Sequence, residues 1–164
     1  MRKCLMLVLT LCSIAVASSA RADFDLAGVA LLGSGVDTGD EPHNPYAFQV
    51  GGEVEMIING FVLGGRVTRA LTSGDVPRDL HLLAFGGDVG YEWELAIVHL
   101  GPRVAMGQVR QIDGDFKSFY VEPGAVVDIE LGWFLIGAEL RYRFVTENMD
   151  RSGIMALARI GLRF

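Results

Sequence analysis

The feature that most constrains this chain is an alternation of apolar and polar residues that begins near residue 24 and continues to Phe164. Side chains on a β-strand alternate between its two faces, so the pattern predicts strands with one apolar face and one polar face. No helical period is present after residue 23. No stretch there approaches the roughly 20 apolar residues that a transmembrane helix needs. A chain of this kind enters a membrane, if it does so at all, as strands.

The alternating region divides into eight expected strands joined by two kinds of connection. The strands are predicted at 24–33, 45–58, 61–71, 79–92, 95–109, 118–131, 134–146 and 153–164. Longer polar loops alternate with three two-residue turns, which are Asn59-Gly60, Trp93-Glu94 and Gly132-Trp133. Asn-Gly favours a type I′ turn and a leading Gly suits type II′, whereas Trp93-Glu94 is placed by parity alone. The pattern predicts an all-β fold, an eight-stranded antiparallel up-and-down transmembrane β-barrel.

Nearly all charged residues of the predicted strands share one face, and hairpin register pairs acids with bases on it. The Asn59-Gly60 turn sets Glu53 opposite Arg66, and the Trp93-Glu94 turn would set Asp88 opposite His99. The pairs expected on the charged face are therefore Glu53 with Arg66, Asp88 with His99, Glu122 with Arg143, and Glu139 with Arg159 across the last hairpin. Because an eight-stranded barrel holds little beyond its own side chains, a charged interior must be internally paired.

Alternation alone does not decide which face lies inside, because a soluble lipocalin-like barrel alternates with its apolar face inward. Aromatic residues favour the membrane alternative, because they gather at the two ends of the apolar face as interfacial girdles. One girdle is expected from Tyr46, Phe119, Tyr142 and Phe144, and the other from Phe24, Phe61, Tyr91, Trp93, Trp133, Phe134 and Phe164.

The first 22 residues have the parts of an export signal: basic Arg2 and Lys3, an apolar stretch, and small residues that close at Ala22. We expect residues 1–22 to be a cleaved signal peptide and residues 23–164 to be a single barrel domain. Both cysteines lie in the removed segment, so the exported part has no thiol or disulfide chemistry. It keeps 11 basic and 20 acidic residues, a net charge of −9, which makes nucleic acid an unfavourable partner.

The last predicted strand, Ala158-Arg159-Ile160-Gly161-Leu162-Arg163-Phe164, ends on an aromatic residue preceded by apolar residues at alternate positions. In this respect the chain resembles the small outer-membrane β-barrels of Gram-negative bacteria, of the type of OmpX and the transmembrane domain of OmpA. The resemblance covers residues 23–164. It implies that Ile160, Leu162 and Phe164 form an assembly signal read by the barrel-assembly machinery, with Arg159 standing where the pattern often has Gly.

The polar residues do not form a complete catalytic or metal-binding pattern. His81 lies near Ser73 and His99 lies near the middle of a strand, but neither has the third group of a nucleophilic triad. The loop cluster of Asp37, Asp40, Glu41 and His43 does not have the spacing of a calcium loop. Glu53 and Glu55, two residues apart, lie on one wall of a packed interior, without the cleft of a glycosidase. We therefore expect no catalytic residues, no metal site and no cofactor.

Together these patterns predict an outer-membrane protein, exported through an N-terminal signal peptide, with a structural or envelope-interaction role and no enzymatic activity. The expected partners are outer-membrane lipid and, during insertion, the barrel-assembly machinery; the protein is expected to be a monomer and not to bind nucleic acid. Two alternatives remain open at this point. One is a narrow gated, porin-like transport channel, and the other is a lipid-modifying outer-membrane enzyme.

Overall fold

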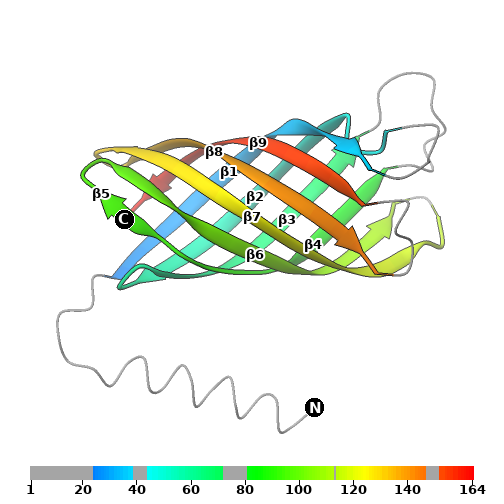
Figure 1. The fold of residues 1–164 in the computed structure, drawn as a ribbon, viewed down its shortest axis with the longest axis horizontal. Helices are drawn as coiled ribbons and strands as arrows, with labels where there is room; N and C mark the ends of the chain where they lie inside the picture. Colours follow the sequence, from blue (N-terminus) through cyan, green and yellow to red (C-terminus); the bar gives the residue numbers. More distant parts are fainter. Residues whose placement is uncertain (1–23, 39–43, 72–80, 113, 147–151) are drawn as a thin grey trace, which may run out of the picture.

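A computed structural model describes residues 24–38, 44–71, 81–112, 114–146 and 152–164, and it shows a barrel (Figure 1). The predicted signal segment lies outside these residues. The strands are β1 (Phe24–Asp37), β2 (Phe48–Ile58), β3 (Phe61–Leu71), β4 (Leu82–Tyr91), β5 (Trp93–Leu95), β6 (Val98–Gln111), β7 (Lys117–Leu131), β8 (Phe134–Val145) and β9 (Gly153–Arg163). No helix in the described ranges is long and apolar enough to cross a membrane.

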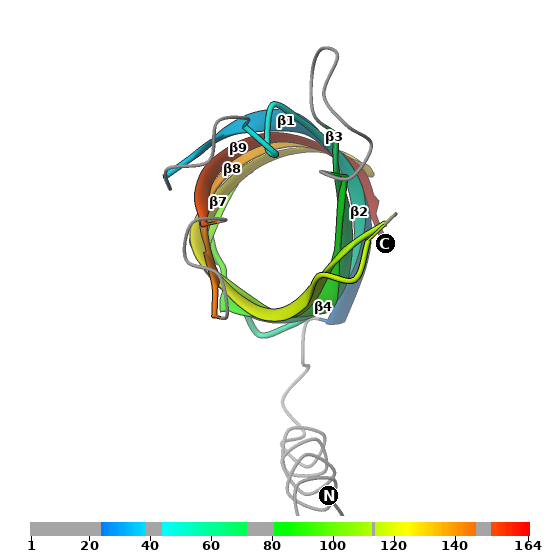
Figure 2. The same cartoon turned by 90° about the vertical axis from the view of Figure 1, so that its right-hand side faces the viewer.

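Eight strands form the wall, and the short β5 extends the hairpin between β4 and β6. Each wall strand pairs antiparallel with its neighbours along the chain, and β4 pairs with β6. The first and last strands also pair, from Ala27 with Arg163 to Asp37 with Gly153, so the sheet closes on itself (Figure 2). Every wall strand therefore has two partners, which leaves no open sheet edge. The predicted eight-stranded antiparallel barrel is confirmed.

Two of the three expected tight turns lie where the sequence places them. Asn59 and Gly60 both have positive φ, 51° and 81°, as a type I′ turn requires. Gly132 has φ 68° in the first central position of the β7–β8 turn. Both turns open into the expected registers, with Glu53 opposite Arg66 and Ala125 opposite Leu140.

The predicted position of the third turn is wrong. Leu95 pairs with Val98, so the turn is Ala96-Ile97 and not Trp93-Glu94. Asp88 consequently lies opposite Ala105, and the predicted pair of Asp88 with His99 does not form. No Gly or Asn marks a turn between residues 91 and 98, so parity alone could not locate it. The pairing shifts by an even number of residues, so β4 and β6 keep their inner and outer faces.

The outer face of the barrel is apolar. Exposed fractions reach 65% for Val54, 61% for Ile160 and 58% for Leu140 in the middle of their strands. Exposed aromatic residues stand at both ends: Phe24, Phe61, Trp93, Trp133, Phe134 and Phe164 at the short-turn end, and Phe48, Phe119 and Phe144 at the other end. Tyr46 is a correction, because it is fully buried inside the mouth ahead of β2 and does not belong to the outer girdle.

The interior contains the charged face and two apolar clusters. At the long-loop end Tyr46 and Tyr120 pack with Leu82, Val109 and Met155 in a buried group inside the mouth. A second group, which includes Val29, Ile57, Val62, Leu135 and Leu157, lines the interior along β1 and its neighbours. The buried charged side chains occupy the rest of the interior.

Candidate functional site in the barrel interior

The centre of the interior is an ion pair that joins opposite walls. Arg66 on β3 donates two hydrogen bonds to Glu139 on β8, with Nη2–Oε1 2.5 Å and Nη1–Oε2 3.0 Å. Three wall strands separate β3 from β8 in either direction around the ring, so this pair spans the barrel. Arg66 also lies 3.3 Å from Glu53 and 3.4 Å from Glu122. A bidentate arginine–carboxylate pair fixes both side chains in orientation as well as distance.

Arg159 on β9 is the second hub of the interior. Its guanidinium nitrogens lie 3.1 Å from Glu53, 2.8 Å from Glu55, 3.0 Å from Asp128 and 3.2 Å from Glu139. Its side chain is fully buried. Four carboxylates converging on one guanidinium compensate its desolvation, which would otherwise cost several kcal/mol.

Two further arginines on β8 extend the network along the barrel. Arg141 reaches Asp88 at 2.5 Å and Glu139 at 3.1 Å. Arg143 donates to Glu122 at 2.7 Å and to the hydroxyl of Thr68 on the opposite wall at 3.0 Å. Gly124, which faces Arg141 across the β7–β8 pairing, provides the space for this packing. A Cβ there would lie 2.5 Å from Cγ of Arg141.

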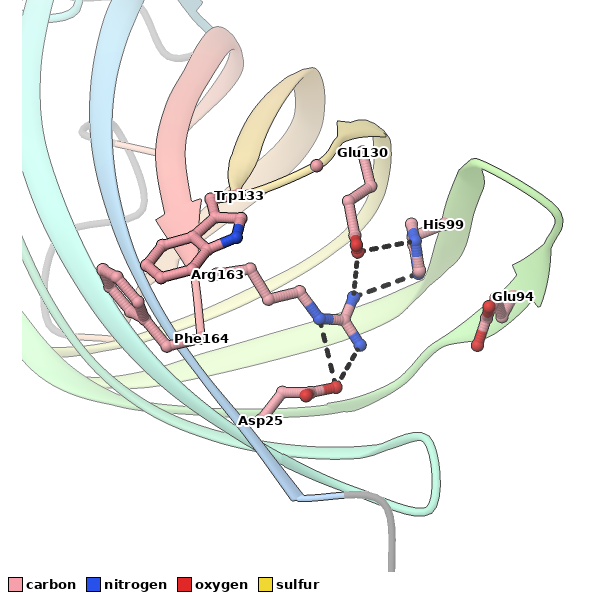
Figure 3. Close-up of a pocket in the computed structure, with 8 residues that line it drawn as sticks. Asp25, Glu94, His99, Glu130, Trp133, Arg163 and Phe164 are labelled. Carbon is pink, nitrogen blue, oxygen red and sulfur yellow. Dashed lines mark hydrogen bonds and ion pairs between the residues drawn. The ribbon is translucent and has the colours of Figure 1, made fainter.

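The short-turn mouth holds a separate cluster around Arg163 (Figure 3). Arg163 lies 2.7 Å from Asp25, 2.9 Å from Glu92 and 3.5 Å from Glu130. His99 lies between two carboxylates, with Nδ1 3.0 Å from Glu92 and Nε2 3.2 Å from Glu130. The cluster opens into a pocket of about 500 Å³, which Trp133 and Phe164 also line.

The structure brings together most of the predicted interior pairs. Glu53 contacts Arg66, Glu122 contacts Arg143, and Glu139 contacts Arg159. Asp88 and His99, predicted as partners, belong to different clusters, with Asp88 on Arg141 and His99 at the mouth. The sequence places seven further members on the charged face without assigning them partners: Glu55, Glu92, Arg103, Asp128, Glu130, Arg141 and Arg163. It does not single out Asp25. Most of their pairs join strands that are not hairpin neighbours, such as Asp128 on β7 with Arg159 on β9, so hairpin register carries no signal for them. Glu92 and Arg103 do share the β4–β6 hairpin, but the sequence misplaces its turn.

The assembly-signal residues lie on the outer face of β9. Ile160 is 61% exposed, Leu162 40% and Phe164 63%. The backbones of Phe164 and Leu26 exchange two hydrogen bonds of 2.9 and 2.8 Å, which extend the β1–β9 seam. The Phe164 ring packs edge-on against Trp133 with centroids 5.6 Å apart.

No family model matches the chain, and a search of curated proteins found no match. Three solved structures are similar to it over 88% of its length and over their whole length. They are Neisserial surface protein A (TM-score 0.64, 16% identity), the N-terminal β-barrel domain of Pseudomonas aeruginosa OprF (0.61, 17%) and the attachment invasion locus protein Ail of Yersinia pestis (0.51, 13%). The chain has the fold of the small outer-membrane β-barrels. At these identities the likeness establishes the architecture alone.

The interior of the barrel is filled by a network of buried ion pairs. Among the described residues, seven buried carboxylates face five buried arginines, so most arginines bridge more than one acid. His99 is held by two carboxylates, and no grouping of three or more metal-ligating side chains occurs in the part of the chain that the structure describes. Ser73, Asp40, Glu41 and His43 of the other sequence candidates lie outside that part.

Proposed function

We propose that the protein spans the bacterial outer membrane as a non-enzymatic barrel with a structural or envelope-interaction role. The observation that carries this proposal is that the distribution of polar and apolar side chains is the reverse of that in a soluble globular protein. The charged side chains are buried and paired, while large apolar side chains are exposed around the wall. An exterior of this kind is stable in lipid, where backbone groups must be satisfied internally. Export by residues 1–22, a monomeric state and contact with outer-membrane lipid belong to the same proposal.

The proposed orientation places the short turns in the periplasm and the longer connections outside the cell, as is usual for barrels with this asymmetry. We further propose that the barrel-assembly machinery recognises Ile160, Leu162 and Phe164 during insertion. Their exposure on the outer face of the last strand supports this role, because they are accessible before β9 has closed onto β1.

A channel receives less support from the interior. The pair of Arg66 with Glu139 and the bond from Arg143 to Thr68 each connect β3 with the opposite strand β8. Conduction would require these buried contacts to separate, which leaves charges unpaired at a cost of several kcal/mol. We therefore propose that the barrel interior is closed to ions.

Membrane fractionation with gel mobility before and after heating tests the proposal. We expect the protein in the outer-membrane fraction, with faster migration before heating because the closed barrel resists detergent. Recovery in the soluble periplasm without heat-modifiable mobility would contradict it. Ion conductance of the purified protein in planar bilayers tests the channel alternative. Steady conductance would contradict a closed interior.

A further inference from the structure

A row of basic side chains lies on the outer face of the barrel, near the end opposite the tight turns. The register sets Arg69 of β3 opposite Leu83 of β4, Leu83 opposite Arg110 of β6, and Arg110 opposite Lys117 of β7. All three cations are exposed. We call Arg69, Arg110 and Lys117 the basic row. With neighbouring strands about 4.8 Å apart, it spans roughly 15 Å of the wall.

The basic row is distinctive because the rest of the outer wall is uncharged. Alternation along the eight wall strands, all of which the structure describes, leaves these three residues as the only charged ones on the outer face. The chain as a whole is acidic, with 20 acidic and 14 basic residues. Three cations and no anions therefore lie on these adjacent wall strands of an acidic protein.

Two cations of the basic row also repel each other. Arg110 and Lys117 lie directly opposite each other on paired strands, a position in which like charges are destabilising. Among the described residues, none of the three forms an ion pair with a carboxylate, although Asp115 lines the same pocket. An external anion between these side chains would relieve the repulsion.

The surroundings of the basic row have the character of a lipid headgroup boundary. The three cations line an open pocket of about 640 Å³ together with Leu83, Ile112 and Phe116. One step toward the middle of the wall, the outer positions of the same strands are Val67, Phe85, Gln108 and Phe119, so the charged row borders a mainly apolar one. The Arg110 guanidinium lies 5.8 Å from the centre of the Phe85 ring, which holds it against the wall.

We infer that the basic row binds the phosphate of a phosphorylated lipid whose acyl chains pack against the apolar wall beside it. This inference rests on the proposed membrane location. Charged side chains on the lipid face are costly at the bilayer midplane but nearly free at its interfaces, so the basic row marks the headgroup level. Guanidinium and ammonium groups recognise phosphate through charge-assisted hydrogen bonds.

Lipid competition on the refolded full chain tests the inference. The protein in neutral detergent is titrated with lipid A against phosphatidylcholine, and bound lipids are counted by native mass spectrometry. The wild type should select lipid A. The variant with Arg69→Gln, Arg110→Gln and Lys117→Gln should lose on the order of a hundredfold of this preference, about fivefold for each basic residue. The variant with Arg69→Lys and Arg110→Lys keeps the charge and should retain most of it.

The outcomes separate this inference from the proposed function. A wild type that folds with heat-modifiable mobility but shows no preference for lipid A overturns the lipid site and leaves the membrane barrel intact. The same conclusion follows if the triple Gln variant keeps the preference. Displacement of lipid A by an equal concentration of inorganic phosphate would show a site for free phosphate in place of a lipid. Failure of the wild type to insert at all overturns both proposals.

Discussion

At the scale of single residues, we expect the largest loss of stability from replacing Arg66. Replacing it with Ala leaves Glu139, Glu53 and Glu122 without their shared cation in a buried position. We expect Arg66→Ala to lower the free energy of unfolding by about 3–5 kcal/mol, the cost of an uncompensated buried charge. Urea unfolding of the barrel in neutral detergent measures this change.

Arg69→Ala is the matched control, because Arg69 lies on the same strand with its side chain exposed on the outer wall. In neutral detergent its effect should stay within about 0.5 kcal/mol, as for most surface substitutions. If Arg66→Ala lowered the free energy of unfolding as little as Arg69→Ala does, the interior would be hydrated and its ion pairs screened by water.

At this scale the sequence predicts partners well where two residues share a hairpin. The residues of the Glu53–Arg66 pair are 13 apart in sequence and directly opposite in register. The residues of the Arg66–Glu139 pair are 73 apart, and their contact depends on barrel diameter and strand tilt. Those two quantities emerge only when the sheet closes, so alternation along single strands does not contain them.

At the scale of elements, the β5–β6 hairpin offers a direct test of register. Ala96 has φ 59°, a left-handed conformation that costs a non-glycine residue about 1–2 kcal/mol. We therefore expect Ala96→Gly to stabilise the barrel by about 1 kcal/mol, measured by urea unfolding. The same change at Ala138, an outward residue in the middle of β8, should destabilise it by about 0.5–1 kcal/mol because glycine weakens a strand.

Opposite signs for the two substitutions support the turn at Ala96-Ile97. Destabilisation by both would favour the turn at Trp93-Glu94, which makes Ala96 an ordinary strand residue.

The ends of the strands are less predictable from the sequence than their existence. β1 continues to Asp37, four residues beyond its predicted end, because pairing with Gly153 to Ala156 on β9 overrides a Gly- and Ser-containing segment that reads locally as a loop.

At the scale of the whole molecule, assembly tests the proposed role of the last strand. Phe164→Ala should slow insertion into vesicles that contain the barrel-assembly machinery, because it removes the terminal ring of the signal. Spontaneous refolding in detergent should change little, since the Phe164 ring is 63% exposed. The comparison of the two insertion rates measures the effect.

Phe61→Ala provides the control, because Phe61 is 68% exposed in the same aromatic belt but lies on β3. An equal delay for both variants would assign the effect to the loss of an interfacial aromatic residue and would exclude a specific signal at Phe164.

The pairing of β1 with β9 also has a consequence for the order of folding. It joins Asp25 to Arg163 and brings Arg159 to Glu55, contacts that bridge 138 and 104 positions of the chain. Contacts of such high order form late and make folding slow. Until that seam forms, an inserted sheet would expose its charged face to hydrocarbon. A half-closed ring is therefore the least stable species on the route, and we expect closure to be a single concerted event.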